Sequence, residues 1–380
     1  MDFSWTDEQR ALRAEVIDFA RAHLNAGADE RDRDGQFPRA LWPRCGAAGL
    51  LGLCIPRDLG GRGVDALSTA VALEALGYAC TDGGLVFSIA AQLTAVAVPM
   101  WKFGTPEQQR ALLPALCDGS RIGAAAMTEA GSGSDVFAMR SRATLDGDHL
   151  RLSGSKQFIT NVPEADVLLV YAMTGPGSRH LGASALVVEA PAAGLRMGGP
   201  LSTLGLRSAV VGELHLDDVR LPRSALLGAP GAGAQVFAHA MDWERVCLFA
   251  AHVGAMQRLI EHGVDHARSL GRELPAGDLQ QVKHRLAELH TTREAARLLV
   301  YRAAADLARD RPASLAASMA KLFVGTAYAD TARAVLDIRG GEDCFARNEI
   351  ERAARDAAAA TIYSGSSEMQ REIIARWLGM

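Results

Sequence analysis

The first 120 residues carry hydrophobic patterns that are mainly helical. Thr6, with Gln9 three positions later, has the pattern of a capping box and predicts a helix over residues 6–24. The apolar stretch 84–101 is too short and too interrupted to span a bilayer, so we expect a buried core helix there. Further helices are expected over residues 37–49, over 65–77 with an end at Gly77, and over 106–117 behind a cap at Thr105.

The pattern changes near Arg121, and from there to about residue 225 the chain has the features of β-strands. Residues 142–160 alternate between apolar and polar and turn at Asp146-Gly147. The β-rich runs 165–174 and 183–190 are bounded by Gly, Pro and Ser. These pieces predict an antiparallel β-domain.

From Gln235 onward the chain is helical again, after a Gly-rich linker over residues 228–233. Long amphipathic patterns that can pack as a four-helix bundle cover residues 235–268, 277–309, 312–340 and 347–361, with a final turn from Ser366. The predicted fold class is therefore α+β. We expect an N-terminal helical domain over residues 1–120, a middle β-domain over 121–230 and a C-terminal bundle over 231–380.

Composition and charge narrow the function classes. The 380 residues are 49% hydrophobic and 22% charged with a net charge of −4, as in an ordinary soluble globular protein. No basic stripe with interleaved aromatics and no long apolar run occurs, so neither nucleic acid nor a membrane is an expected partner. Six cysteines without CxxC spacing and ten scattered histidines predict reduced, mostly buried thiols in the cytoplasm and no metal site.

Glu244 is the most unusual position in the long helical patterns. On a helix it shares a face with Ala240, Met241, Cys247 and Leu248, because residues three and four apart lie side by side. A carboxylate on an apolar stripe is costly unless it is paired, protonated or used in chemistry. The residues alone leave two alternatives, a Glu that pairs with Arg or reaches water, and a catalytic carboxylate.

Two loop segments could bind a ligand. Residues 125–135, AAMTEAGSGSD, offer hydroxyls and backbone N–H groups of the kind that bind phosphates or heteroaromatic edges. Residues 156–161, KQFITN, end a predicted strand with an aromatic residue and a Thr. The alternatives are a plain flexible loop and the edge of a core strand. No dinucleotide fingerprint, P-loop, HExxH or GxSxG motif is present.

Four segments together carry a common signature. Residues 127–135 match TEPxAGSD with Ala130 where Pro is usual, and residues 156–161 match KxFITN. Residues 205–222 match a GxRSS…FxDVxVP segment, and residues 355–376 match RDAxxxxIYEGTxxIQRxxIAR with Ser364 in place of Glu. In this order and spacing, the chain resembles the acyl-CoA dehydrogenase family over essentially its full length.

The resemblance implies FAD as the cofactor. It places the isoalloxazine edge at the loop containing Met127, Thr128, Gly133 and Ser134, with Phe158 and Thr160 lying against the flavin. It assigns further cofactor positions to Arg268, Gln280, Asp337, Gly340, Gly341, Ser366 and Glu368. Arg268 and Gln280 would reach the FAD of a neighbouring subunit, so a homodimer or homotetramer is expected.

This sequence departs from the family pattern in the dinucleotide half of the FAD site. The segment from Arg268 to Gln280 is one residue longer and lacks a Phe, while Asp337 replaces Gln and Asp343 replaces Gly. Extra carboxylates near a pyrophosphate are unfavourable unless they are turned away or paired with Arg339 or Arg268. We therefore expect weaker FAD binding than is usual in the family.

By the same resemblance the substrate is an acyl thioester, and a carboxylate removes its α-proton. Serine at position 364 cannot be that base unaided. A minority of the family, including the isovaleryl and long-chain types, has the base in a sequence like Asp242-Trp243-Glu244-Arg245. Glu244 is therefore the predicted base, its apolar neighbours should raise its pKa, and Ser364→Ala is expected to change little.

The remaining predicted contacts concern the substrate. The backbone N–H of residue 364 would hold the thioester oxygen, and Arg245 would face phosphate or pantetheine or else form an ion pair. The predicted substrate-binding residues are Ser134, Met241, Arg245, Ser364 and Gly365. The electron acceptor is expected to be an electron-transfer flavoprotein or oxygen.

Several functions remain open at this point. The acyl group could be carried by CoA or by an acyl or peptidyl carrier protein, because the Trp-Glu pair followed by Cys-Leu also resembles prolyl-carrier dehydrogenases. A flavin monooxygenase of the same fold would not need a base for the α-proton. A scaffold that has lost its flavin would explain the altered residues 337–343.

Overall fold

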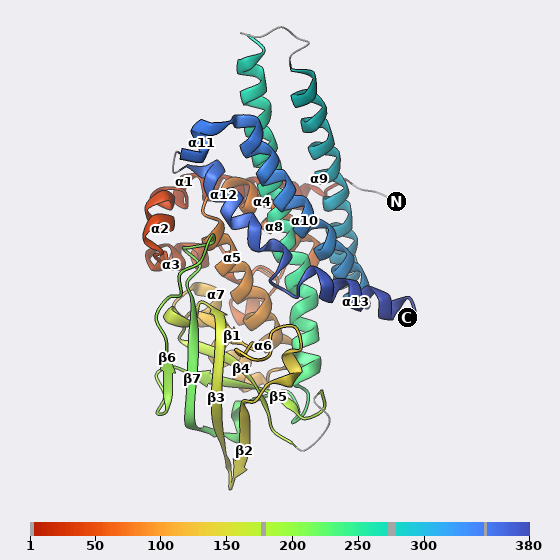
Figure 1. Cartoon of the computed structure of the whole chain (residues 1–380). Helices are drawn as coiled ribbons and strands as arrows, with labels where there is room; N and C mark the ends of the chain where they lie inside the picture. The colour runs from red at the N-terminus through yellow and green to blue at the C-terminus, as the bar shows by residue number, and fades with distance from the viewer. Residues whose placement is uncertain (1–3, 176–179, 273–278, 346–347) are drawn as a thin grey trace.

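The computed structural model describes residues 4–175, 180–272, 279–345 and 348–380. Helices from both ends of the chain form one layered body, and the β-sheet from the middle of the chain lies beside them, at the bottom of Figure 1. This helix–sheet–helix order confirms the predicted α+β fold class.

The N-terminal part is helical, as predicted. Thr6 and Gln9 form the expected capping box in front of α1, and Thr105 and Gln108 form another in front of α7. The short polar helix α2 was not predicted, because its seven residues have no apolar face. The helices are α1 Asp7–His23, α2 Ala28–Asp34, α3 Trp42–Ala47, α4 Ala66–Ala79, α5 Gly83–Gln92, α6 Val98–Phe103 and α7 Pro106–Asp118.

The predicted end of α4 at Gly77 is wrong, because the helix continues to Ala79. A Cβ atom on Gly77 would lie 1.9 Å from the carbonyl oxygen of Ala251 on helix α8, Gly233–Leu270. A Cβ atom on Gly254 would lie equally close, 1.9 Å, to the carbonyl oxygen of Glu74 on α4. The two glycines let α4 and α8 approach closely, so Gly77 serves packing rather than termination.

Residues 83–103 form one helical stretch, in which a π-helical segment, Leu93–Ala97, joins α5 to α6. The stretch is 21 residues long and apolar enough to cross a membrane by length and composition, so the sequence argument that it is too short is wrong. However, 89% of its most apolar window is buried inside the protein. The expected role as a core helix is confirmed.

The middle of the chain forms an eight-stranded sheet with the order β6-β7-β3-β2-β4-β5-β8, and β1 pairs with β4. Most pairs are antiparallel, as predicted, but β1–β4 and β2–β4 are parallel. Long connections before β4 allow these parallel pairs, which the local pattern did not indicate. The strands are β1 Gly123–Ala126, β2 Arg142–Asp146, β3 His149–Thr160, β4 Val167–Met173, β5 Ala183–Glu189, β6 Leu195–Met197, β7 Val211–Pro222 and β8 Leu226–Leu227.

Strand β4 is buried on both faces. Leu168 and Val170 pack in the core of the β-domain, whereas Leu169 and Tyr171 pack in the core shared with the helices. Successive residues of a strand point to opposite faces. Tyr171 therefore lies on the side of the sheet that meets the helices.

The C-terminal part contains three long helices, α8 Gly233–Leu270, α9 Gln280–Leu307 and α10 Ser314–Arg339. The fourth predicted long helix is shorter, since α12 covers only Glu349–Ala358, and the short helix α11, Gly341–Phe345, precedes it. The predicted final turn is an 11-residue helix, α13 Ser367–Trp377, with Ser366 as its N-cap. Ser364 and Gly365 separate α12 from α13 with left-handed φ angles of 57° and 88°.

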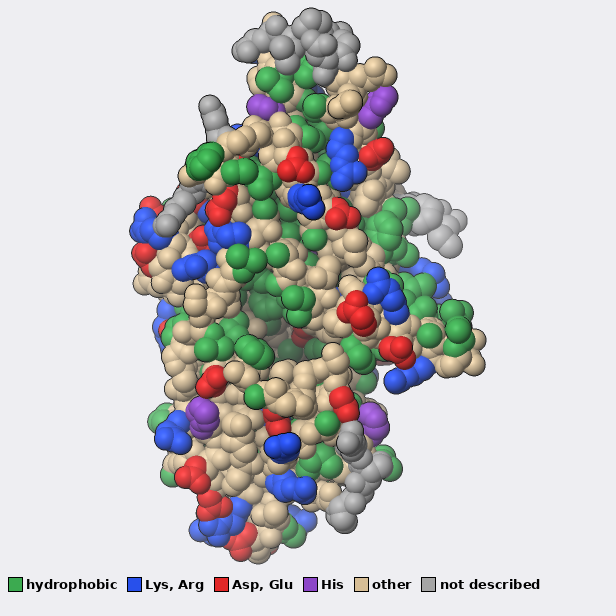
Figure 2. Space-filling model, in the orientation of Figure 1, with side chains coloured by type: hydrophobic (Ala, Val, Ile, Leu, Met, Phe, Trp, Pro, Cys, Tyr) green, Lys and Arg blue, Asp and Glu red, His purple; other side chains and the backbone are tan. Residues whose placement is uncertain are grey.

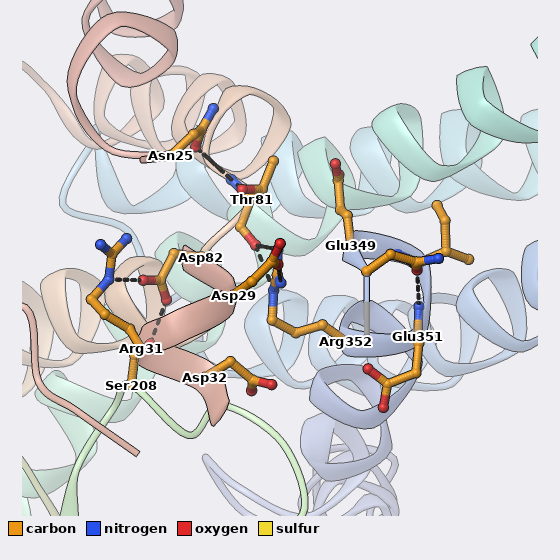
Figure 3. A network of polar contacts seen from close by, with 12 residues as sticks. Asn25, Asp29, Arg31, Asp32, Thr81, Asp82, Ser208, Glu349, Glu351 and Arg352 are labelled. Atoms are coloured by element: carbon orange, nitrogen blue, oxygen red, sulfur yellow. Dashed lines mark hydrogen bonds and ion pairs between the residues drawn. The ribbon is translucent and has the colours of Figure 1, made fainter. Parts of the chain in front are cut away.

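A polar network joins the three parts of the chain (Figure 3). Arg31 on α2 contacts Asp82 before α5 at 2.7 Å, and Asp82 also accepts a hydrogen bond from Ser208 of the β-domain. Arg352 on α12 pairs with Asp29 on α2. Because α12 leads into the turn at Ser364, the network fixes the start of that turn relative to the other two parts.

Candidate active site

The middle of α8 carries the predicted base. Phe237, Met241 and Glu244 lie on one face of this helix, because they are four and three residues apart. Burial raises the pKa of the Glu244 carboxyl above its ordinary value, while the Ser364 hydroxyl and the charge of Arg245 act in the opposite direction. The side chain nevertheless stays partly accessible. A deep carboxyl group that is still partly accessible suits proton transfer.

The turn at Ser364 lies directly against Glu244. The Ser364 hydroxyl donates a hydrogen bond of 2.5 Å to Oε1 of Glu244. Arg245 Nε donates to the Ser364 carbonyl at 3.1 Å, and Gln370 Nε2 donates to the Gly365 carbonyl at 2.9 Å. The structure thus brings four predicted site residues together. The Ser364 side chain, for which no role was expected, contacts the carboxylate directly.

Arg245 is buried within the chain and does not point outward from its surface. Besides the Ser364 carbonyl, it lies 3.9 Å from Oδ1 of Asp242, one turn earlier on α8. Of the two predicted alternatives, phosphate contact or ion pairing, the described contacts match ion pairing. Arg245 therefore holds the turn that carries Ser364.

The two predicted flavin segments are joined by a buried ion pair. Lys156 Nζ on β3 lies 2.9 Å from Oε1 of Glu129, with side chains that expose 0% and 9% of their surface. Lys156 also donates to the Met127 carbonyl at 3.0 Å. The backbone N–H of Gln157 donates to the Thr128 carbonyl at 2.9 Å. The loop containing Met127 and Thr128 is therefore fixed beside the strand that carries Phe158.

Phe158 has the features of a residue that meets a ligand. It has a φ of 60° within an irregular part of β3, and its apolar side chain is 61% exposed. Such strain and exposure cost free energy unless a partner covers the ring. Figure 2 shows a hollow between the helical body and the β-domain, with hydrophobic side chains around it. A planar apolar ring with a polar edge, as in the flavin of FAD, fits Phe158 and the adjoining loop.

The other predicted residues on this side lie close in the chain to Phe158, Glu244 or Ser364. Ser134 and Gly133 are exposed on the loop after Thr128, and Thr160 is the last residue of β3. Met241 is buried one turn before Glu244. Ser366 caps α13 by accepting a hydrogen bond from the Met369 N–H, and the exposed Glu368 pairs with Arg371 at 3.1 Å.

Tyr171 is a candidate that the sequence analysis missed. Its ring packs on Phe237 with 5.7 Å between ring centroids. Its buried hydroxyl has no hydrogen-bond partner within the described part of the chain. Burial raises the pKa of Tyr171, and the nearby charge of Glu244 raises it further. The alternation along β4 could have placed Tyr171 toward the helices, but not beside Glu244.

The predicted dinucleotide residues lie elsewhere. Arg268 is 74% exposed near the end of α8, and 24 helical residues, about 36 Å, separate it from Glu244. Gln280, at the start of α9, is exposed, and Asp337 on α10 is 71% exposed. Gly340 and Gly341 have open space around them, beyond the end of α10. Within a single chain Arg268 therefore lies far from Glu244, near the end of α8 that is drawn at the top of Figure 1.

The carboxylate of Asp343 is neutralised within the chain, by one of the two arginines that could pair with it. It pairs with Arg339 and accepts a hydrogen bond of 2.6 Å from Asn348. The hydrogen bond from Arg339 is the main reason that its pKa is lowered. Asp343 is therefore turned toward internal partners.

Comparison with known proteins agrees with this architecture. The N-terminal, middle and C-terminal domains of acyl-CoA dehydrogenases match residues 6–120, 124–219 and 231–379. An L-prolyl-peptidyl-carrier protein dehydrogenase of Pseudomonas fluorescens is 43% identical, with 100% of both chains covered. The crystal structure of the prolyl acyl carrier protein oxidase AnaB has a TM-score of 0.95 at 36% identity and covers 99% of this chain and 100% of its own. The FAD complex of PigA has a TM-score of 0.95 at 31% identity and covers 100% of this chain and 99% of its own.

These matches confirm the resemblance to the acyl-CoA dehydrogenase family, from which FAD and the thioester chemistry were predicted. They cover the whole chain, including the segments around Phe158, Glu244 and Ser364. The chain therefore belongs to the acyl-CoA dehydrogenase family and is an FAD-dependent oxidoreductase that acts on a CH–CH bond of an acyl thioester.

Proposed function

We propose that the protein dehydrogenates an aminoacyl group that a peptidyl carrier protein holds as a thioester. The first candidate for this group is L-proline. Two relatives over the full chain length are named for this reaction, from Pseudomonas fluorescens at 43% identity and from Serratia at 33%. The observation that carries the chemistry is the deep carboxylate of Glu244, which accepts a hydrogen bond from the Ser364 hydroxyl. An aminoacyl substrate also suits the unpartnered hydroxyl of Tyr171 near that carboxylate.

The reaction breaks two C–H bonds and forms a Cα–Cβ double bond, and different residues contribute to different steps. Glu244 accepts the proton from Cα, and burial suits it to this role by raising its pKa toward neutrality. The backbone N–H of Ser364 has no hydrogen-bond partner in the described structure, so it can donate to the thioester oxygen as negative charge builds there. The chemistry that FAD would supply when bound is acceptance of the hydride from Cβ. Phe158 and the loop at Thr128 would hold the flavin, and the apolar face of α8 would exclude water.

The test uses purified protein under anaerobic conditions. L-prolyl and butyryl thioesters are presented in two forms each, on a peptidyl carrier protein and on CoA, and loss of the 450-nm flavin absorbance is followed. We expect the fastest bleaching with the carrier-bound prolyl group. Faster bleaching by either CoA ester would overturn the proposed carrier, and faster bleaching by the butyryl forms would overturn the aminoacyl substrate.

The same preparation separates the competing functions. A colourless protein that never takes up FAD would favour the scaffold. A yellow protein that bleaches only with a nicotinamide reductant and then inserts oxygen would favour a monooxygenase. After bleaching, we expect reoxidation by an electron-transfer flavoprotein or by oxygen, and measurement of peroxide distinguishes the two acceptors.

We also propose a homo-oligomer, a dimer or a tetramer, in which a neighbouring subunit supplies Arg268 and Gln280. The support is the distance along α8 between Arg268 and Glu244 within one chain. Light scattering of the purified protein gives the oligomeric state, and a monomer that binds FAD normally would contradict this proposal.

A further inference from the structure

We propose that Ser364 is a positioning residue for the base: its hydroxyl occupies one carboxylate oxygen of Glu244, so that the substrate proton arrives at the other oxygen. This inference rests on the proposed role of Glu244 as the base. It assigns to Ser364 a side-chain function that differs from the predicted backbone contact with the substrate.

The hydrogen-bond pattern decides which oxygen is free. A carboxylate has two oxygens, and the Ser364 hydroxyl, 2.5 Å from Oε1, has a single hydrogen to donate. Within the described chain no donor contacts Oε2 of Glu244. Oε2 is therefore the oxygen available to the Cα proton, and the hydrogen bond fixes the rotation of the carboxylate that presents it.

The backbone around Ser364 is built to aim this hydroxyl. Ser364 has a φ of 57°, in the left-handed region that residues other than glycine rarely adopt. Its carbonyl accepts hydrogen bonds from Arg245 at 3.1 Å and from Gln370 at 3.2 Å. At Gly365, with a φ of 88°, a Cβ atom would lie 2.7 Å from Gln370 Nε2. Backbone strain that is held by several partners is typical of functional sites.

Two opposing effects act on the ionisation of Glu244. Burial disfavours the charged carboxylate, and a hydrogen bond donated to the charged form favours it. Without the Ser364 hydroxyl, burial would be opposed chiefly by the charge of Arg245. A larger fraction of Glu244 would then be protonated at a given pH and unable to accept a proton.

Other titratable groups pack around Glu244 and must be separated from it. They are Asp242 and Arg245 on α8, Tyr171 on β4, Tyr363 beside the turn, and Lys321 on α10 near Arg245. Burial raises the pKa of Asp242 to about 6, so Asp242 could itself titrate in the relevant range. An Asp242→Asn background therefore belongs in the experiment.

The kinetic test compares Ser364→Ala and Ser364→Gly with the parent protein. Both variants remove the hydroxyl, but glycine also tolerates the left-handed φ, so a shared effect reports the hydroxyl rather than backbone strain. We expect the rate of anaerobic flavin bleaching to fall about tenfold on the acid side of the pH profile, as for the loss of one charge-assisted hydrogen bond, and to recover as the pH rises. Ser367→Ala is the control, because Ser367 is a buried serine near the same turn that bonds to Thr361 instead.

A second measurement needs no substrate. The C=O stretch of protonated Glu244 is followed by infrared difference spectroscopy across pH in the Asp242→Asn background, and the band is identified by its absence in Glu244→Gln. We expect its titration midpoint to move to higher pH in both Ser364 variants but not in Ser367→Ala. An unchanged midpoint, or a rate loss independent of pH, would overturn the proposal. A shifted midpoint in a protein whose flavin no thioester bleaches would leave the effect of Ser364 on the Glu244 carboxyl standing, but would refute the proposed function and with it the role of Glu244 as the base.

Discussion

Two halves of the predicted FAD site differ sharply in this structure. In the flavin half, a buried ion pair joins Lys156 to Glu129 beside Phe158, and a partly buried hydrogen bond joins Ser364 to Glu244, all within one chain. The dinucleotide half, around Arg268 and Asp337, lies exposed at the end of the helical bundle. The same sequence signature predicted both halves, but one chain completes only the first.

The difference indicates where each half obtains its free energy of assembly. In the flavin half, the Lys156–Glu129 ion pair and the hydrogen bond from Ser364 to Glu244 form within the protein, so these contacts exist before any ligand binds. Among the described residues, Arg268 pairs with its neighbour Asp265 at 3.1 Å, an exposed pair of small energetic value. The Arg268 side chain must therefore be held in place by FAD or by another subunit. Substitutions in the two halves should therefore have different effects. Those in the flavin half should change the reaction rate and the stability of the fold, and those in the dinucleotide half should change FAD affinity and subunit assembly.

The largest effect is expected at Glu244. Glu244→Gln keeps the shape and the hydrogen bond from Ser364 but cannot accept a proton, so anaerobic bleaching should slow by about 10²- to 10⁴-fold. Flavin content should stay the same, because Glu244 belongs to the chemistry rather than to cofactor binding. Stopped-flow absorbance spectroscopy measures both the rate of bleaching and the flavin content. Glu261→Gln, farther along the same helix, is the control, and parental rates in Glu244→Gln would rule out the base.

The next largest effect concerns the ion pair that joins the flavin segments. Lys156→Met leaves the Glu129 carboxylate buried without its cation, and loss of one partner of a buried pair costs about 3–5 kcal/mol. We expect a lower thermal midpoint in the FAD-free protein, measured by circular dichroism. The double variant Glu129→Gln with Lys156→Met removes both charges and should regain much of the loss. A double variant no more stable than Lys156→Met alone would show that the pair is not the cause.

The same pair gives a pH dependence of stability. Burial by itself raises the pKa of Glu129, but hydrogen bonds from Ser141, Arg140 and Lys156 outweigh it and bring the pKa below the ordinary value of 4.5. Because the folded pKa is lowered, the contribution to stability is present above pH 4.5 and is lost as the pH falls through the folded value. The thermal midpoint of the parent should therefore drop more steeply below pH 4.5 than that of Glu129→Gln. Equal slopes would contradict this assignment.

A fourth experiment tests whether the dinucleotide half is completed by a neighbouring subunit. Arg268→Ala and Glu244→Gln subunits are each expected to be poorly active. When they are mixed and reassembled, a site with an intact Glu244 can receive the Arg268 of its partner, so about a quarter of the parental activity should return for a randomly mixed symmetric dimer. Arg268→Ala subunits refolded alone are the control. No recovery in proven mixed oligomers would place Arg268 in the site of its own chain.

Several elements could be predicted from the sequence because they are local. The capping box at Thr6, the strand ending at Thr160 and the carboxylate on the apolar face of α8 each follow from residues a few positions apart. The role of the Ser364 side chain could not be predicted. Its direction depends on a left-handed backbone held by Arg245 and Gln370, and Arg245 is 119 positions away.

The errors elsewhere have the same physical origin. Gly77 looked like a helix end, but it serves a contact with Ala251 that is far away in the sequence. Parallel pairing of β1 with β4 also depends on a long connection rather than on local pattern. In the dinucleotide half, the resemblance assigned Arg268 and Gln280 to the FAD of a neighbouring subunit, and the separation of Arg268 from Glu244 along α8 agrees with that assignment.

The smallest expected effect is at Asp337, where the family pattern has Gln. Asp337 is exposed and only loosely paired with Arg333 at 4.0 Å, so its charge can act on a bound pyrophosphate. Asp337→Gln should tighten FAD binding a few-fold at low salt, measured by fluorescence titration of the FAD-free protein, and screening should reduce the gain at high ionic strength. Asp330→Asn removes an equal charge from the same helix and is the control. A gain in FAD affinity shared by both variants would reflect net charge alone. A gain confined to Asp337→Gln would place this residue at the dinucleotide, where one exposed charge is enough to change FAD affinity.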